Sequence, residues 1–264
     1  MGKDSISMRT PWLVNRKPNR RAGVRLFCFP HAGGGDSIFR SWQQSLPDTI
    51  EVCPVQLPGR GLRITEPPYT EMNQLIQVAG EALAPYLDKP FALFGHSMGA
   101  LIAFELARHI RREYSAQPVH LFVSGRCSPQ TISGPLDSKL FDSELPELLR
   151  RNNGTPEEVL ENPELMELVA PVLRADVTLC NSYVYTPKPP FSFPITAFGG
   201  LDDHGVPRRY IEGWREHTTG PFVLRMVPGD HFFLNTSRLL LLEAISKELE
   251  QDMREKGMGH CNAS

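Results

Sequence analysis

The sequence lacks the features that mark membrane, secreted and nucleic-acid-binding proteins. None of its apolar runs approaches the roughly 18 residues that a membrane span requires, and the longest aliphatic run, Leu239 to Leu242, lies in an amphipathic pattern. The basic residues 1–22 contain no apolar core of the kind found in secretory signals. A formal net charge of -2 gives no excess of basic groups. We therefore expect a soluble protein without a membrane or nucleic-acid partner.

Cysteine is scarce as well, and its spacing gives no metal or redox motif. The five cysteines are far apart in the sequence and include no C-x-x-C pair. Isolated cysteines in odd number are more typical of a reducing compartment than of a disulfide framework. We expect a cytoplasmic protein that requires no metal ion and no cofactor.

What the sequence does contain is an alternation of short apolar runs with helix-like stretches. Such alternation predicts an α/β fold with a mostly parallel sheet flanked by helices. The expected strands are Val24 to Pro30, Glu51 to Gln56, Phe91 to Gly95, Val119 to Ser124, Pro194 to Phe198 and Phe222 to Val227. Because these runs are almost continuously apolar, both faces of the sheet should be covered.

A long segment interrupts the alternation between the fourth and fifth expected strands. Almost seventy residues separate Ser124 from Pro194, far more than the dozen or so that a crossover requires. Helix-start patterns at Thr155 and Asn162, each followed by proline and glutamate, predict that the insertion is helical. We place a helical lid at about residues 135–185.

The insertion also carries an apolar stripe at helical spacing between Leu165 and Leu179. Such a stripe serves either as a lid over a pocket or as ordinary core packing, and the sequence alone favours neither. Around the insertion we expect one α/β domain at residues 23–255. An N-terminal arm at residues 1–22 precedes it, and a flexible tail at residues 256–264 follows.

One motif in the third strand and the helix after it indicates nucleophilic catalysis. The strand ending at Gly95 runs into the pattern G-x-S-x-G, which has Ser97 at its centre and a helix after Gly99. This is the arrangement of a nucleophile elbow, in which a serine occupies a sharp strand-to-helix turn. Glycine is needed at both flanks because a side chain would collide with neighbouring backbone. Ser97 is therefore the candidate nucleophile.

A serine hydroxyl reacts only when a base takes its proton, and the base in turn needs an acid to orient it. His231 follows the last expected strand and is the candidate base, because the chain order serine, acid, histidine favours it over His204. Asp202 and Asp203 both follow the fifth strand. We choose Asp203 as the acid, since it falls at the loop apex, whereas Asp202 suits a turn or helix cap.

Two backbone N–H groups should stabilise the oxyanion that forms on the substrate carbonyl. One belongs to Met98, directly after the candidate nucleophile. The other belongs to Ala32, in the glycine-rich loop from Pro30 to Gly35. This loop matches neither common phosphate-binding glycine motif, so we favour an oxyanion hole over a phosphate site.

Taken together, five segments resemble those of the type II thioesterases, a family with the α/β-hydrolase fold. The resemblance extends from about Val24 to Ile245. Its most specific parts are the block Leu57 to Arg60 and His31, the histidine after the first strand, which general lipases and esterases do not share. The segments are Phe29-Pro-His-Ala-Gly-Gly, Gln56-Leu-Pro-Gly-Arg-Gly-Leu-Arg63, Phe94-Gly-His-Ser-Met-Gly, Phe198-Gly-Gly-Leu-Asp-Asp and Pro228-Gly-Asp-His-Phe-Phe.

The resemblance implies a reaction and a partner. Ser97, Asp203 and His231 match the family's triad, and Ala32 and Met98 match its oxyanion amides. The implied substrate is an acyl group held as a thioester on the phosphopantetheine arm of an acyl or peptidyl carrier protein. Hydrolysis would release that group from a polyketide or nonribosomal peptide synthase, most often to clear a misprimed or stalled chain.

The resemblance also singles out residues around the site. Arg174 begins a block, Arg174-Ala-Asp176, that matches the end of the family's lid. Arg60 and Arg63 are candidates to meet the acidic surface of a carrier protein, although solvated side chains or pairing within their own loop is the favoured alternative. Asp230 departs from the family, which usually has glycine there, and leaves the rate and pH dependence of the reaction open. We expect a monomer.

Two other functions share parts of this pattern. A small-molecule esterase or lipase would use the same triad on a substrate without a carrier protein. A binding protein on this fold would have lost catalysis, and the full set of triad and oxyanion positions argues against it. Comparison of carrier-bound thioesters with simple esters would separate the first alternative from a thioesterase.

Overall fold

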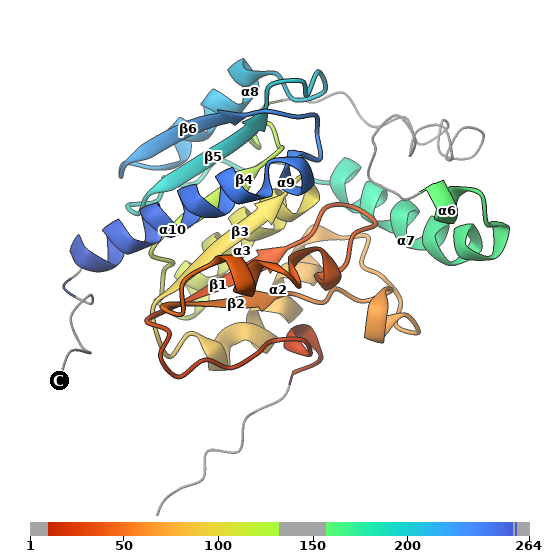
Figure 1. The fold of residues 1–264 in the computed structure, drawn as a ribbon, viewed down its shortest axis with the longest axis horizontal. Helices are drawn as coiled ribbons and strands as arrows, with labels where there is room; N and C mark the ends of the chain where they lie inside the picture. The colour runs from red at the N-terminus through yellow and green to blue at the C-terminus, as the bar shows by residue number, and fades with distance from the viewer. Residues whose placement is uncertain (1–9, 132–156, 256, 258–264) are drawn as a thin grey trace, which may run out of the picture.

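A six-stranded, fully parallel sheet forms the centre of the computed structural model, which describes residues 10–131, 157–255 and 257 (Figure 1). Its strands are β1 (Val24–Phe29), β2 (Ile50–Pro54), β3 (Phe91–His96), β4 (Leu121–Ser124), β5 (Ile195–Gly200) and β6 (Phe222–Val227). They lie in the order β2-β1-β3-β4-β5-β6. All six expected strands are present, and the predicted α/β-hydrolase architecture is confirmed.

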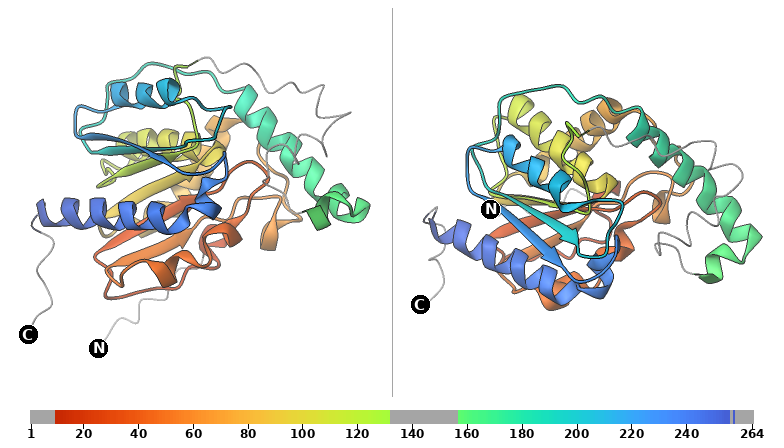
Figure 2. Two further views of the ribbon diagram at one scale, coloured as in Figure 1. Left: turned by 45° about the horizontal axis from the view of Figure 1, so that its top comes forward. Right: turned by 90° about the horizontal axis from the view of Figure 1, so that it is seen from above.

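Helices cover both faces of the sheet (Figures 1 and 2). α2 and α3 pack together on one face, where they bury one hydrophobic cluster, and α1, α9 and α10 bury a second cluster on the other face. The helices are α1 (Trp42–Ser45), α2 (Met72–Leu83), α3 (Met98–Glu113), α6 (Glu157–Leu160), α7 (Pro163–Asn181), α8 (Arg208–Glu212), α9 (Phe233–Thr236) and α10 (Arg238–Glu255). Short 3-10 helices are η1 (Pro11–Leu13), η2 (Asp36–Phe39), η3 (Gly61–Arg63), η4 (Ala84–Tyr86) and η5 (Gly213–His217). Among the described residues, none of the helices combines the length and apolar content of a membrane span.

The burial of the strands follows their position in the sheet. β1 to β5 are buried along their whole length, as their continuous apolar sequences predict. β6 lies at one edge of the sheet, and of its residues only Val227 is fully buried. The expectation of two covered faces therefore holds for the inner strands and only in part for this edge strand.

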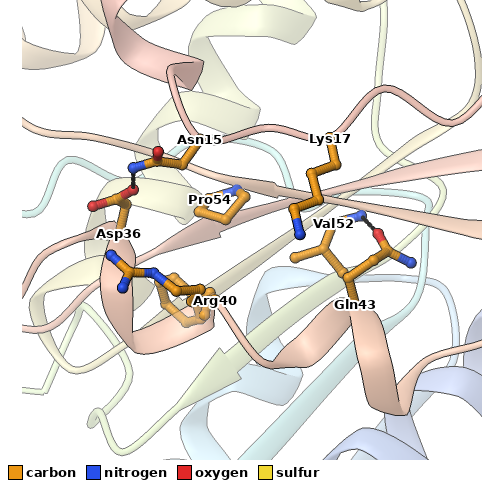
Figure 3. A pocket seen from close by; sticks show the side chains of 8 residues that line it. Asn15, Lys17, Asp36, Arg40, Gln43, Val52 and Pro54 are labelled. Carbon is orange, nitrogen blue, oxygen red and sulfur yellow. Dashed lines mark hydrogen bonds between the residues drawn. The ribbon is translucent and has the colours of Figure 1, made fainter.

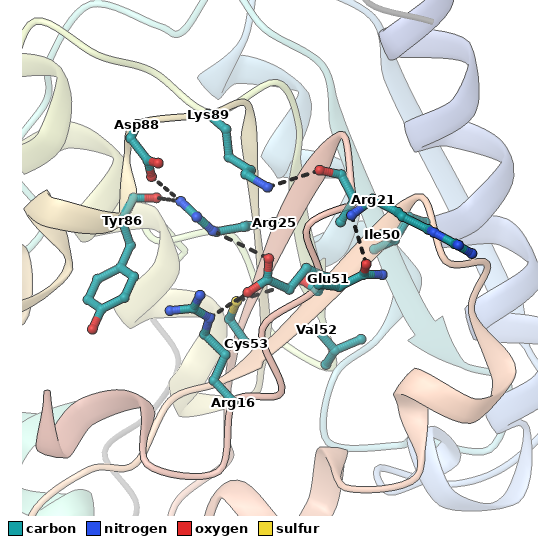
Figure 4. Close-up of polar contacts among 12 residues, drawn as sticks. Arg16, Arg21, Arg25, Ile50, Glu51, Val52, Cys53, Tyr86, Asp88 and Lys89 are labelled. Atoms are coloured by element: carbon teal, nitrogen blue, oxygen red, sulfur yellow. Dashed lines mark hydrogen bonds and ion pairs between the residues drawn. The ribbon is translucent and has the colours of Figure 1, made fainter. Parts of the chain in front are cut away.

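The N-terminal segment packs against the sheet from residue 10 onward. Trp12 and Leu13 are buried in the cluster that also contains α2 and α3. Arg16 pairs with Glu51, a buried carboxylate of β2, which also lies 3.6 Å from the Arg25 guanidinium (Figure 4). This part of the expected arm is thus held by apolar packing and by charge pairing. Residues 1–9 of the arm and residues 258–264 of the tail lie outside the described residues.

Helix α7 begins where the sequence predicts it. The side chain of Asn162 accepts hydrogen bonds from the backbone N–H groups of Glu164, at 3.0 Å, and Leu165, at 3.3 Å. It thereby satisfies two of the donors that a helix start leaves free, while Pro163 has no N–H to satisfy. The other predicted helix start, at Thr155, lies outside the described residues together with the first part of the expected lid.

Among the described residues, the C-terminal half of α7 is the more buried half, while Met166 and Ala170 nearer its start pack in a small cluster that includes Leu160 of α6. Val172, Leu173 and Leu179 are buried, whereas Leu165 and Leu168 are exposed. The C-terminal end of α7 accordingly lies at the carboxyl edge of the sheet, and its N-terminal end projects away from the sheet (Figures 1 and 2). The buried part of the apolar stripe is therefore its C-terminal part, which approaches the glycine-rich loop through Leu173.

Candidate active site

The strand order places the candidate site. After β1 the chain forms β2 on one side and then crosses to β3 on the other, so the winding reverses between β1 and β3. In parallel sheets the loops at the carboxyl ends of two such strands diverge and leave room for a ligand. Phe29 at the end of β1 pairs with Gly95 near the end of β3. The glycine-rich loop after β1 and the loop that carries Ser97 therefore meet at this point.

Ser97 has the backbone conformation of a nucleophile elbow. Its φ of 54° and ψ of -114° lie in a region that non-glycine residues rarely adopt. A Cβ atom on Gly95 would lie 2.0 Å from the carbonyl oxygen of Gly99, and one on Gly99 would lie 2.2 Å from the carbonyl oxygen of Phe29. The Ser97 N–H donates a hydrogen bond to the carbonyl of Ser124 at 2.7 Å. Glycine at both flanks is thus a steric requirement, as the motif predicts.

The loops after β5 and β6 bring Asp203 and His231 together. His231 Nδ1 lies 2.7 Å from Asp203 Oδ2. The other carboxylate oxygen, Oδ1, accepts hydrogen bonds from the backbone N–H groups of Gly205, at 3.1 Å, and Val206, at 3.2 Å. Asp203 is buried, whereas the His231 ring is half-buried. The carboxylate is therefore held by the backbone of its own loop, while part of the His231 ring is accessible to solvent.

The rival residues occupy different positions. Asp202 and His204 are both exposed, and neither is hydrogen-bonded to His231 in the part of the chain that the structure describes. The Asp230 carboxylate accepts a hydrogen bond from the Phe232 N–H at 2.8 Å. The residue that departs from the family pattern therefore stabilises the turn that leads from β6 to α9.

Two further histidines, His96 and His31, lie near His231, an arrangement that their positions along the chain do not indicate. The rings of His96 and His231 have centroids 5.2 Å apart, and His31 lies 6.2 Å from His96. Burial lowers the pKa of His31 to about 4, and burial together with the neighbouring His231 lowers the pKa of His96. Both rings are consequently neutral at pH 7, so the two histidine side chains near His231 carry no charge.

The glycine-rich loop after β1 forms a tight turn. The Gly34 N–H donates to the His31 carbonyl at 3.0 Å, and Gly33 has a φ of +75°, which favours glycine. Ala32 lies within this turn and packs against a small apolar cluster contributed by α6 and α7. Met98 is the first residue of α3, where a backbone N–H has no acceptor within the helix. The two amides predicted for the oxyanion hole thus belong to the two loops that meet at the switch point.

Arg60 and Arg63 both pair with carboxylates of the same chain, and for Arg63 this is the pairing within its own loop that we favoured over carrier docking. Arg60 is buried and forms a two-pronged ion pair with Asp176 of α7, at 2.6 and 2.7 Å. Arg63 is also buried; its guanidinium pairs with Glu66 of the same loop and lies 4.6 Å from the centre of the Trp12 ring. Both guanidinium groups are therefore engaged within the chain, Arg60 with a distant helix and Arg63 with its own loop. Arg174 is exposed on α7.

A small cavity lies near these loops in the described part of the chain. A cavity of about 10 Å³, roughly the space of one water molecule, lies beside Met98 between α7 and the loop after β2. Its apolar lining is contributed by Leu57, Tyr69, Leu75, Met98 and Leu179. A hollow of about 40 Å³ between the N-terminal segment and η2 shares no residue with the candidate site (Figure 3). Within the described ranges, no group of three His, Cys, Asp or Glu side chains is arranged to hold a metal ion.

Comparisons with known proteins agree with this geometry. The sequence matches the model of the thioesterase domain family over residues 24–252. Gramicidin S biosynthesis protein GrsT of Aneurinibacillus migulanus is 48% identical over 245 residues, which cover 92% of this chain and 96% of that protein. RedJ, a thioesterase from the prodiginine biosynthetic pathway in Streptomyces coelicolor, is similar in structure with a TM-score of 0.82 and 42% identity, covering 88% of this chain and 87% of that one. The type II thioesterase BorB from the borrelidin biosynthetic cluster has a TM-score of 0.81 and 36% identity, with 88% and 95% coverage.

Fold and family together define an enzyme of the serine hydrolase class on an α/β-hydrolase scaffold. The chain belongs to the thioesterase family, and its resemblance to the type II thioesterases is confirmed. The activity that the family defines is hydrolysis of acyl thioesters.

Proposed function

We propose that this thioesterase removes acyl groups from the phosphopantetheine arm of acyl or peptidyl carrier proteins, and that it clears misprimed or stalled chains from a nonribosomal peptide or polyketide synthase. The biosynthetic systems to which GrsT, RedJ and BorB belong support this setting. The observation that carries the chemistry is the strained conformation of Ser97 at the end of β3, directly after His96, whose ring lies 5.2 Å from the ring of the Asp203-bound His231.

The reaction begins with attack of Ser97 Oγ on the thioester carbonyl. The short contact between Asp203 Oδ2 and His231 Nδ1 places the imidazole proton on Nδ1, because a carboxylate oxygen can only accept. The other ring nitrogen, Nε2, is left with a free lone pair. It takes the proton of Ser97 as the new carbon–oxygen bond forms.

Charge then develops on the carbonyl oxygen, and the backbone N–H groups of Ala32 and Met98 stabilise it. Loss of one such donor costs about 2.7 to 4 kcal/mol in the transition state of other hydrolases. As the tetrahedral intermediate collapses, the carbon–sulfur bond breaks and protonated His231 delivers its proton to the departing thiol. Water then attacks the Ser97 ester while His231 takes its proton. The protonated His231 returns a proton to Ser97 Oγ as the carbon–oxygen bond to the serine breaks and the carboxylic acid leaves.

Every group that this mechanism uses lies within a single chain, so one chain can form a complete site, and we propose a monomer as the active unit. We place the reaction in the cytoplasm, in keeping with the buried side chains of Cys28 and Cys53, which form no disulfide among the described residues. The exposed Arg174 on α7 remains a candidate contact for an acidic carrier protein. The C-terminal half of α7, which borders the cavity beside Met98, is the proposed determinant of acyl-chain length.

A comparison of two substrates tests the proposal. The same short acyl group is offered on a holo carrier protein and on free pantetheine, and kcat/KM is measured for each by thiol release. We expect at least a roughly tenfold higher kcat/KM for the carrier-bound thioester, equivalent to about 1.4 kcal/mol of added transition-state binding. Faster hydrolysis of a nitrophenyl ester than of either thioester, with no preference for the carrier, would contradict it and favour a small-molecule esterase.

A further inference from the structure

Asp176 connects α7 with two loops that are far from it in the sequence. Its Oδ2 atom accepts a hydrogen bond from the Gly33 N–H at 2.7 Å and another from Arg60 Nη1 at 2.6 Å. Its Oδ1 atom accepts from Arg60 Nη2 at 2.7 Å. Asp176 is 3% exposed and Arg60 is 7% exposed, so the pair is withdrawn from water. One carboxylate of α7 thus holds both the glycine-rich loop and the loop after β2.

The guanidinium of Arg60 is committed to the same arrangement. Besides the carboxylate it contacts the Gly34 carbonyl, at 3.1 Å from Nη1, and the Pro58 carbonyl, at 3.2 Å from Nε. A buried ion pair contributes little net stability, because removing two charges from water offsets most of their attraction. The ion pair instead provides geometric specificity, because its two parallel hydrogen bonds hold α7 and the two loops in one relative arrangement.

The bond from Gly33 fixes the orientation of one peptide plane. In the turn from His31 to Gly34, the φ of +75° at Gly33 is the value required at the third residue of a type II turn. The peptide between Ala32 and Gly33 is held at both ends: its N–H donates to Asp176, and its carbonyl lies 2.9 Å from His31 Nδ1. Rotation of this peptide would convert the turn to another type and break both contacts.

We propose that Asp176 is a positioning residue for the oxyanion loop and that Arg60 acts through it. This inference rests on the proposed role of the Ala32 amide in catalysis. By holding the next peptide, the Asp176 carboxylate keeps the turn in the shape that directs the Ala32 N–H at the reacting carbonyl. Leu173 of the same helix reinforces the contact, since it lies against Gly33. The loop therefore has its catalytic shape only while α7 is seated on it.

The substitution Asp176→Asn tests this role, because it keeps the size of the side chain and removes its charge. We expect kcat to fall about 10- to 100-fold while KM changes by less than about threefold, as a small displacement of an oxyanion donor affects the transition state more than the bound substrate. The inhibition constant of an acyl trifluoromethyl ketone, which forms a tetrahedral adduct with the serine, should rise by the same factor. A purely structural role would not produce this match.

Glu66→Gln is the matched control, since it disrupts the neighbouring Arg63–Glu66 pair without touching the glycine-rich loop, and it should leave kcat unchanged. Arg60→Lys keeps the charge but not the two-pronged geometry, and should give a smaller, parallel loss of kcat and inhibitor affinity. If Asp176→Asn does not fold, Arg60→Lys serves as the test of the positioning role. An unchanged kcat in a folded variant, or a loss of kcat without a loss of inhibitor affinity, would overturn the proposal. Ser97→Ala, measured alongside, separates the two levels: an active Ser97→Ala enzyme refutes the proposed function itself.

Discussion

Replacing Ser97 with alanine is expected to lower kcat for thioester hydrolysis by a factor of about 10⁴ or more, the range found when the nucleophile of a serine hydrolase is removed. The substitution removes the only atom that forms the covalent bond to the acyl group. The backbone amides and the acyl pocket remain, so substrate binding should be retained. Steady-state hydrolysis of an acyl pantetheine thioester, followed through the released thiol, measures the loss.

The matched control is Ser246→Ala, the same chemical change on α10, where the hydroxyl contacts only the Glu250 carboxylate among the described residues. Its kcat should equal that of the unmodified enzyme. A Ser97→Ala enzyme that keeps more than about a tenth of the activity would show that another group performs the reaction. The assignment of Ser97 could not survive that result.

The second large effect is expected from Asp203→Asn, with a loss of about 10⁴-fold in kcat, as in other hydrolases in which the orienting acid becomes an amide. The backbone N–H groups of Gly205 and Val206 donate to Oδ1 and will hold the amide oxygen of asparagine there. The NH₂ group then faces His231 Nδ1 and forces the ring proton onto Nε2. In that tautomer the ring cannot accept the proton of Ser97.

Asp202→Asn provides the matched control, since Asp202 is adjacent in the sequence but exposed. Its kcat should change by less than about threefold. Rate constants for both variants at the pH of maximal activity make the comparison direct. Equal losses in the two variants, or a larger loss in Asp202→Asn, would mean that the acid has been assigned to the wrong carboxylate.

The sheet and the elbow could be predicted because their signals are local. Continuous apolar runs identify buried parallel strands, and glycine at positions 95 and 99 reports a backbone crossing that admits no side chain. The choice of His231 over His204 needed only the chain order, and the choice of Asp203 over Asp202 only the position within one loop. These inferences depend on neighbours in sequence, so a single sequence suffices for them.

The contacts of Arg60 could not be predicted in the same way. Arginines are mostly exposed, and pairing with Asp176 requires the approach of residues 116 positions apart. The pair connects two blocks of the sequence, Leu57 to Arg60 and Arg174 to Asp176, but neither block contains a signal that the two lie in contact. The approach of His31 and His96 to His231 is of the same kind. Helix α7 shows a third limit, since the uniform apolar stripe does not reveal that Leu165 and Leu168 are exposed while Leu173 and Leu179 are buried.

Trapping the acyl-enzyme tests most directly whether Ser97 is the nucleophile. The protein is mixed with an acyl carrier thioester, quenched in acid within milliseconds to seconds, digested, and analysed by mass spectrometry. We expect an ester-linked acyl group on the peptide that contains Ser97, formed and consumed at rates consistent with turnover and absent from Ser97→Ala. Full turnover without any adduct on Ser97, or with an adduct on another residue that forms at the same rate, would contradict it.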